Sequence, residues 1–316
     1  MEEATMTKPV VLALAGLMPG PFAELEANCT VHRLWEAEDR EALIQRVAPE
    51  VRGIVTGPGV SAEFMDRFPA LEIIGNFGVG YDKVDTAHAK SRGVRVTNTP
   101  GVLDDEVADL GLLLMLATAR RLCVGDRFVR AGKWTQGGLP LARSLRGKRL
   151  GVVGMGRIGQ AVAERAKVFG LSIAWHGPRV KPEIDHPYYP DLVALAKDSD
   201  VLVLCCPGGA ATHHIVNRAV IEALGPEGIL VNIARGTVVD EPEMVSALVD
   251  GRLGAAGLDV FEHEPTVPEA LYKLDNVVLQ PHVGSATVET RNAMADLVVR
   301  NLLAHFAGQP LLTPVV

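Results

Sequence analysis

One stretch of the chain, residues 149–169, joins an apolar strand pattern to a glycine-rich turn and then to a helical pattern. The turn reads Gly154-Met155-Gly156-Arg157-Ile158-Gly159. In such a turn the first glycine permits the tight reversal, the second lets the backbone approach a pyrophosphate, and the third lets the helix pack against the strand. The N-terminus of the helix also attracts an anion. Because the motif stands between a strand and a helix, it predicts a dinucleotide-binding fold.

Short apolar runs rich in β-branched residues recur about every 20 residues along the chain, the spacing of strand–helix units with short connections. They predict a first series of strands at 10–15, 31–34, 53–56, 71–74 and 94–97. A second series is predicted at 149–153, 171–175, 201–205, 229–233, 255–258 and 277–279. Helical patterns lie between several of them, at 36–47, 62–68, 158–169, 190–197, 219–224 and 242–250. Nearly all-apolar runs are typical of parallel strands covered on both faces, so the sequence predicts an α/β fold.

Two long apolar helical patterns, 104–122 and 287–306, stand outside these repeats. We interpret them as the crossings between two domains, which also suits 316 residues at about 150 per domain. The first domain is then expected at 1–99 plus 285–316, and the second at 100–284. Asp240, with Glu243 three residues on, is a capping signal for the helix predicted at 242–250.

Composition excludes several classes of protein. The formal net charge of −7, from 31 basic and 38 acidic residues, argues against a nucleic-acid binder or a basic membrane-surface protein. The longest apolar stretch, 110–119, is too short to span a membrane. The first ten residues hold two acids and no apolar core, unlike a secretory signal. The four cysteines show no C-x-x-C spacing, so we expect reduced thiols in a cytoplasmic protein.

The strand after the glycine turn bears on the type of dinucleotide. An acid at its end would bind the free 2′-hydroxyl of NAD, but this strand ends in His176 and no acid appears before Glu183. Arg179 and Lys181 offer positive charge instead. Because an arginine can bind a 2′-phosphate with two hydrogen bonds, we expect NADPH/NADP to be preferred. In the alternative reading Arg179 is a solvated loop residue and NADH serves as well.

Three further segments stand just beyond predicted strand ends, where open parallel sheets bind ligands. They carry Arg235, Glu264 and His282. Each alone can be read as a surface arginine, a turn acid or a loop histidine. Together they suit the reduction of a 2-oxo acid: the Arg235 fork binds a carboxylate, His282 donates a proton near neutral pH, and Glu264 orients the imidazole and favours its protonated form.

At these residues the sequence resembles the D-2-hydroxyacid dehydrogenase family almost from end to end. The matching segments are 76–82, 154–159, 232–240, 257–261, 264–265 and 281–284. Within the family it is most similar to the glyoxylate/hydroxypyruvate reductases and the related hydroxyphenylpyruvate reductases, and a strand ending in His176 is typical of that NADPH-using branch. The chain departs from the branch at Gly177-Pro178, which moves the usual arginine to Arg179.

The resemblance implies two flavodoxin- or Rossmann-like domains with parallel sheets and an active site in the cleft between them. Arg235, Glu264 and His282 match the catalytic positions, and the Val79-Gly80 backbone would bind the substrate carboxylate together with Arg235 and His282. The implied dinucleotide contacts are Gly154, Met155, Gly156, Arg157, Ile158 and Gly159 at the pyrophosphate, His176, Arg179, Pro207 and Thr212 on the adenosine side, and Ile233, Ala234, Asp259, His282 and Gly284 around the nicotinamide. The resemblance also implies a homodimer formed through the cofactor domain.

Other suggestive residues are given structural roles. Cys205-Cys206 ends a predicted buried strand, so packing is the preferred reading. His213-His214 and Glu262-His263-Glu264 lack metal-ligand spacing, and no metal is expected. The segment 134–141 is open to two readings, a plain loop or a cap over a substrate pocket, including that of a neighbouring subunit.

The sequence therefore predicts an NADPH-dependent reductase that converts a small 2-oxo acid, glyoxylate or hydroxypyruvate, to the D-2-hydroxy acid. One alternative is a reductase of bulkier aromatic 2-oxo acids such as hydroxyphenylpyruvate. Another, from a different class, is a dinucleotide-sensing binding protein without catalysis.

Overall fold

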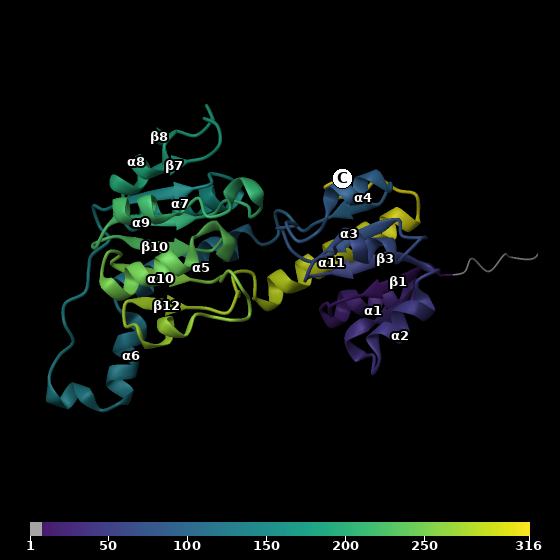
Figure 1. Ribbon diagram of the computed structural model, residues 1–316, viewed down its shortest axis with the longest axis horizontal. Coiled ribbons are helices and arrows are strands. Elements are labelled where there is room, and N and C mark those ends of the chain that lie inside the picture. Colours follow the sequence, from purple (N-terminus) through teal and green to yellow (C-terminus); the bar gives the residue numbers. More distant parts are fainter. Residues whose placement is uncertain (1–7) are drawn as a thin grey trace, which may run out of the picture. The chain divides into compact units, whose positions relative to one another are not determined.

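A computed structural model describes residues 8–316, which divide into two compact units. Among the described residues, unit 1 comprises 8–103 and 285–316, and unit 2 comprises 104–284 (Figure 1). The first boundary falls directly before a helix at Asp104, four residues later than the one expected from the sequence. The second falls at Gly284–Ser285.

Unit 1 is built on a five-stranded parallel sheet with the order β2-β1-β3-β4-β5, the flavodoxin-like order. Its strands are β1 Val10–Ala13, β2 Thr30–Arg33, β3 Val51–Thr56, β4 Ile73–Asn76 and β5 Arg95–Thr97. Its helices are α1 Pro19–Asn28, α2 Arg40–Val47, α3 Ala62–Asp66, α4 Thr86–Ser91 and α11 Val288–Phe306, with a 3₁₀ turn at Leu34–Glu36.

Helix α11 returns from the far end of the sequence to cover one face of this sheet, as the yellow ribbon beside the purple and blue strands in Figure 1 shows. The approach is close: a Cβ atom built on Gly75 in β4 would lie 2.9 Å from Val298 Cγ1. Leu25 of α1 and Leu302 of α11 are fully buried in the same cluster. Helices α2, α3 and α4 contribute buried residues to the opposite cluster, together with strands β1, β3, β4 and β5.

Unit 2 is built on a seven-stranded parallel sheet with the order β12-β11-β10-β9-β6-β7-β8. Its strands are β6 Arg149–Val153, β7 Ser172–His176, β8 Tyr188–Tyr189, β9 Val201–Leu204, β10 Ile229–Asn232, β11 Ala255–Leu258 and β12 Val277–Leu279. Its helices are α5 Asp104–Ala119, α6 Leu122–Arg130, α7 Arg157–Val168, α8 Leu192–Lys197, α9 Arg218–Leu224 and α10 Glu241–Asp250. The strand order reverses between β6 and β9, so the topological switch point lies between these two strands.

Several boundaries differ from the sequence-based expectation for local reasons. The helix expected at 36–47 begins at Arg40, because the Asp39 carboxylate accepts the Ala42 N–H and caps it there. The helix expected at 104–122 ends at Ala119, and Arg121 takes a left-handed conformation (φ 54°) before α6 begins. The capping role expected of Asp240 is confirmed, since its carboxylate accepts the Glu243 N–H at 3.2 Å.

The four cysteines are free thiols, as expected. Cys206 is buried, and burial raises the pKa of its thiol to about 11, which leaves it unreactive near neutral pH. Across residues 8–316 no helix combines the length and the apolar character needed to cross a membrane.

Candidate active site

The glycine turn between β6 and α7 has the geometry of a phosphate cradle. Gly154 has φ +95°, and a Cβ atom on it would lie 2.6 Å from the Cys206 backbone nitrogen. A Cβ atom on Gly159 would lie 2.2 Å from the Gly154 carbonyl oxygen. In contrast, a Cβ atom on Gly156 would meet nothing within 4 Å. Glycine is therefore needed for packing at the first and third positions, while the second leaves open space over the backbone.

The N-terminus of α7 faces this turn without a side-chain cap. Its N-cap residue is Gly156, which offers no side chain to the N–H groups of the first turn, and the helix then runs for 12 residues. Lys181 Nζ donates to the Met155 carbonyl oxygen at 2.8 Å, which ties the loop after β7 to the turn. Uncapped N–H groups, a helix dipole and open space fit the pyrophosphate of a dinucleotide.

The end of β7 lies beside the cradle, because the Gly154 N–H donates to the His176 carbonyl oxygen at 2.9 Å. His176 Nδ1 lies 2.9 Å from the Tyr189 carbonyl oxygen, so strand β8 fixes the ring. Arg179 is exposed in the following loop. On the other side of β6, the loop after β9 is braced by Thr212 Oγ1, which donates to the Pro207 carbonyl oxygen at 2.6 Å.

Three loops follow the carboxyl ends of the neighbouring strands β10, β11 and β12. The first carries Arg235 and is held by Asn232, which is 1% exposed. The Asn232 side chain accepts the Ala234 N–H at 3.0 Å and donates to the Arg235 carbonyl oxygen at 2.9 Å. The Arg235 side chain in turn donates to the Ala234 carbonyl oxygen at 2.7 Å. The buried amide thus sets the position from which the guanidinium extends.

Asp259, which is 2% exposed, clamps the loop that carries His282. Its two carboxylate oxygens accept the Val283 and Gly284 N–H groups at 2.7 and 2.9 Å, and its carbonyl oxygen accepts the His282 N–H at 2.7 Å. Burial raises the pKa of the Asp259 carboxyl, while the two N–H groups act in the opposite direction. His282 itself has φ +55°, a left-handed conformation that an unclamped residue of this type rarely adopts.

Glu264 and His282 form a hydrogen-bonded pair beyond the carboxyl ends of β11 and β12. Glu264 Oε2 lies 2.9 Å from His282 Nδ1, and Glu264 Oε1 accepts the Phe261 N–H at 3.2 Å. A carboxylate in contact with one imidazole nitrogen orients the ring. The His282 side chain is 46% exposed, so the pair is accessible, with Nε2 as the nitrogen turned away from Glu264. This arrangement suits proton transfer.

Comparison with known proteins identifies the family. Residues 112–284, more than half of the chain, match the D-isomer specific 2-hydroxyacid dehydrogenase NAD-binding domain. The chain belongs to the D-isomer specific 2-hydroxyacid dehydrogenase family. It is therefore an oxidoreductase that uses a nicotinamide dinucleotide, and the resemblance seen in its sequence is confirmed.

Relatives of this dehydrogenase are similar over nearly their whole length. Hydroxyphenylpyruvate reductase of Plectranthus scutellarioides is 54% identical over 93% of this chain and 94% of the relative. A glyoxylate/hydroxypyruvate reductase of Arabidopsis thaliana is 51% identical, with the same coverage. Among solved structures, the NADPH-dependent glyoxylate/hydroxypyruvate reductase of Sinorhizobium meliloti, in complex with NADP and malonate, has a TM-score of 0.91 at 43% identity. That match covers 98% of this chain and 97% of the other.

The remaining sequence-predicted residues of the dehydrogenase, Val79 and Gly80, lie in unit 1 in the loop after β4. Their loop is held by side-chain amides: Asn76 Nδ2 donates to the Gly80 carbonyl oxygen at 2.9 Å, and Asn98 Nδ2 donates to the Val79 carbonyl oxygen at 2.9 Å. Both carbonyl groups are thus engaged within unit 1.

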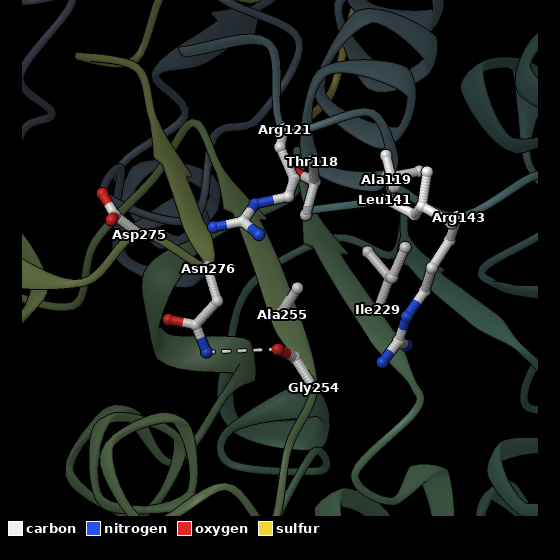
Figure 2. Close-up of a pocket in the computed structure, with 11 residues that line it drawn as sticks. Thr118, Ala119, Arg121, Leu141, Arg143, Ile229, Gly254, Ala255, Asp275 and Asn276 are labelled. Carbon is white, nitrogen blue, oxygen red and sulfur yellow. Dashed lines mark hydrogen bonds between the residues drawn. The ribbon is translucent and has the colours of Figure 1, made fainter. Parts of the chain in front are cut away.

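A pocket of about 430 Å³ in unit 2 of the dehydrogenase lies at the amino ends of the strands (Figure 2). It is lined by Ile229 and Ala255, the first residues of β10 and β11, and by Asn276, just before β12. Asn276 Nδ2 donates to the Gly254 carbonyl oxygen at 3.1 Å, the dashed contact in Figure 2. Because the glycine turn, Arg235 and His282 all follow carboxyl strand ends, this pocket is not the candidate active site.

Proposed function

We propose that this dehydrogenase uses NADPH to reduce a small 2-oxo acid, glyoxylate or hydroxypyruvate, to the D-2-hydroxy acid. The observation that carries the proposal is the Glu264–His282 pair, in which Glu264 Oε2 lies 2.9 Å from His282 Nδ1. Glu264 and His282 follow strands β11 and β12, and Arg235 follows the neighbouring strand β10. The dinucleotide supplies the hydride to the keto carbon. His282 Nε2 donates the proton to the oxygen that becomes the hydroxyl group, and Glu264 orients the imidazole for the transfer.

Arg235 binds the substrate carboxylate in this proposal, because its planar fork matches two carboxylate oxygens. The Val79 and Gly80 N–H groups would bind the same carboxylate, since their carbonyl groups are held by Asn98 and Asn76.

The test of the proton donor is His282→Ala, with His263→Ala as the matched control because His263 is exposed in the same group of loops. We expect kcat to fall about 100-fold or more in His282→Ala, the usual contribution of a general acid, with NADPH affinity unchanged. His263→Ala should keep its kcat. Full activity in His282→Ala would refute the assignment.

The preference for NADPH rests on charge beside the cradle. No acidic residue lies between 172 and 182, and Arg179 and Lys181 follow the strand end at His176. The relative from Sinorhizobium meliloti is named as NADPH-dependent and was solved with NADP. We expect Arg179→Ala to raise KM for NADPH about tenfold, the loss of one charge-assisted contact, and to leave KM for NADH unchanged. Equal efficiency of the unmodified enzyme with both cofactors would overturn the preference.

A second candidate substrate class is favoured by one comparison. The relative that is 54% identical is named a hydroxyphenylpyruvate reductase. Initial rates with glyoxylate, hydroxypyruvate, pyruvate, phenylpyruvate and hydroxyphenylpyruvate, each with NADPH, separate the two classes. Higher kcat/KM on the small acids supports the first proposal, and higher kcat/KM on the aromatic acids supports the second. NADPH binding without turnover of any of the five would instead support the dinucleotide-sensing protein.

We further propose that the dehydrogenase is a homodimer formed through unit 2. Large apolar side chains are exposed along α5, α6 and the loop that follows them: Leu113, Leu122, Val129, Trp134 and Leu141. Apolar patches of this kind mark protein–protein interfaces. Sedimentation equilibrium should give twice the 33.7 kDa chain mass, and Leu122→Asp should shift the population toward the monomer.

A further inference from the structure

His214 occupies a junction between three loops of unit 2. It follows the Pro207–Thr212 loop and has φ +50°, a left-handed conformation. Its N–H donates to the Thr237 carbonyl oxygen at 2.9 Å, two residues from Arg235. Its Nε2 lies 2.8 Å from Glu262 Oε1, two residues from Glu264. One strained residue therefore contacts both loops that carry proposed catalytic side chains.

Glu262 is itself held on several sides. Its side chain is 13% exposed, and its N–H donates to Glu241 Oε2 at 3.0 Å. Glu241 is 6% exposed at the start of α10. A Cβ atom on Gly236 would lie 1.9 Å from the Phe261 carbonyl carbon, so the Arg235 loop rests directly on the peptide before Glu262. A shift of Glu262 would thus displace the segment that carries Glu264 and the loop that carries Arg235.

The adjacent His213 suggests a metal site, but the ring geometry does not fit one. The two imidazoles are stacked with centroids 3.9 Å apart and 24° between their planes. A metal ion bound through nitrogen lies in the plane of each ring, and two nearly parallel planes at this separation share no point near both nitrogens. His213 Nε2 is also 4.0 Å from Glu262 Oε1. In these conformations His214 serves Glu262 as a hydrogen-bond partner, and His213 packs on it.

We propose that His214 and Glu262 are positioning residues that set Glu264 and Arg235 relative to the dinucleotide loop Pro207–Thr212. The inference rests on the proposed function, because it assigns their effect to the Glu264–His282 pair. Neither residue acts on the substrate directly. When His214 is held by both loops, Glu264 stays within hydrogen-bonding distance of His282 Nδ1 and keeps the imidazole oriented.

The experiment compares His214→Ala with His213→Ala, a neighbour in ring contact that makes no short bond to Glu262. We expect kcat to fall about tenfold or more in His214→Ala, the cost of misplacing a catalytic group, with a smaller change in KM for the 2-oxo acid. His213→Ala should keep its kcat. A loss of fold would instead lower the thermal unfolding midpoint of His214→Ala together with its kcat.

Two further variants keep the test decisive if His214→Ala folds poorly. In His214→Gln the amide nitrogen can take the place of Nε2, so we expect kcat to return toward that of the unmodified enzyme. Glu262→Ala should reproduce His214→Ala, and the double variant should be no worse than either single one, because both remove the same contact. Additive losses, or an unchanged kcat in His214→Ala, would overturn the proposal.

The outcome is separable from that of the proposed function. Full activity in His282→Ala would remove the proposed proton donor itself. An inactive His282→Ala together with an unchanged kcat in His214→Ala would overturn only the positioning role.

Discussion

In each unit the first strand leads through a short loop into a helix, but these two helices present different N-termini. In unit 1, β1 leads through residues 14–18 into α1, whose first three residues are Pro19, Gly20 and Pro21. Two of these have no N–H group. In unit 2, β6 leads through three residues into α7, whose first residues Arg157, Ile158 and Gly159 all keep their N–H groups. Only the second helix can direct a row of donors at a phosphate.

The difference shows that the parallel strand–helix topology does not by itself create a dinucleotide site. Both first strands lie inside their sheets, and both helices follow within a few residues. What distinguishes unit 2 is local: glycines at the points of closest backbone approach, and uncapped N–H donors at the start of a 12-residue helix. The fold supplies the position, and the residues of one turn supply the chemistry.

The largest expected effect comes from filling the tightest glycine of the cradle. Gly159→Ala places a Cβ atom 2.2 Å from the Gly154 carbonyl oxygen, so the turn must move. We expect about 3 kcal/mol or more of lost stability, as in overpacked cores, and loss of NADPH binding. Gly20→Ala in α1 is the matched control, because its Cβ atom meets nothing within 4 Å. It should be neutral or stabilising by up to about 1 kcal/mol. Urea unfolding and fluorescence titration with NADPH measure both quantities, and a stable Gly159→Ala that binds NADPH would contradict the comparison.

An intermediate effect is expected from giving α7 one feature of α1. Arg157→Pro removes a single N–H at the first helical position, where proline is tolerated and where the extended Gly156 (φ −83°, ψ −160°) can precede it. Arg157→Ala removes the side chain and keeps the N–H. We expect NADPH to bind about tenfold more weakly to the proline variant than to the alanine variant, since one hydrogen bond to a charged group is lost. Equal dissociation constants would show that this N–H does not contact the cofactor.

The smallest effect is expected from the Arg52–Glu72 ion pair of unit 1, which is remote in sequence from the cofactor turn. The hydrogen bond from Arg52 lowers the pKa of the Glu72 carboxyl, with His305 adding to it against the effect of burial. A carboxyl with a lowered pKa in the folded state stabilises the protein above its unfolded pKa, and this stability is lost as the pH falls through the folded value. Because Glu72 is 38% exposed, Glu72→Gln should cost less than about 1 kcal/mol at pH 7.

The loss of stability caused by Glu72→Gln should become smaller as the pH falls below the ordinary carboxyl range, while KM for NADPH stays unchanged. Thermal unfolding midpoints across pH 7 to pH 4 follow the first quantity, and initial rates follow the second. A deficit that is constant with pH would mean that the charge of Glu72 contributes nothing.

Local signals predicted most of the fold. The strands at Arg149–Val153, Ala255–Leu258 and Val277–Leu279 match their predicted ranges, and the Asp240 cap was readable because its partner is three residues away. Helix α1 was not predicted, because the prolines and glycine of its first turn are residues typical of loops. The two-residue strand β8 is defined by pairing with β7 and has no pattern of its own.

The candidate site could be predicted only where its parts follow strand ends. Glu264 and His282 were expected to act together, and the structure places them in hydrogen-bonding contact. The contact of His214 with Glu262 joins residues 48 positions apart and depends on the left-handed backbone conformation of His214, so no sequence pattern predicts it. The clamp that Asp259 forms on the His282 loop was missed for the same reason, although Asp259 itself had been singled out.

The return of α11 to unit 1 has a consequence for synthesis on the ribosome. Strands β1, β3 and β4 emerge early, but the helix that buries one of their apolar faces is translated after the whole of unit 2. Unit 2 is continuous in sequence and can complete its core first. The apolar sheet face of nascent unit 1 therefore stays uncovered while about 180 residues are added, at roughly 5–20 residues per second. Chaperone dependence during translation should accordingly be a property of unit 1.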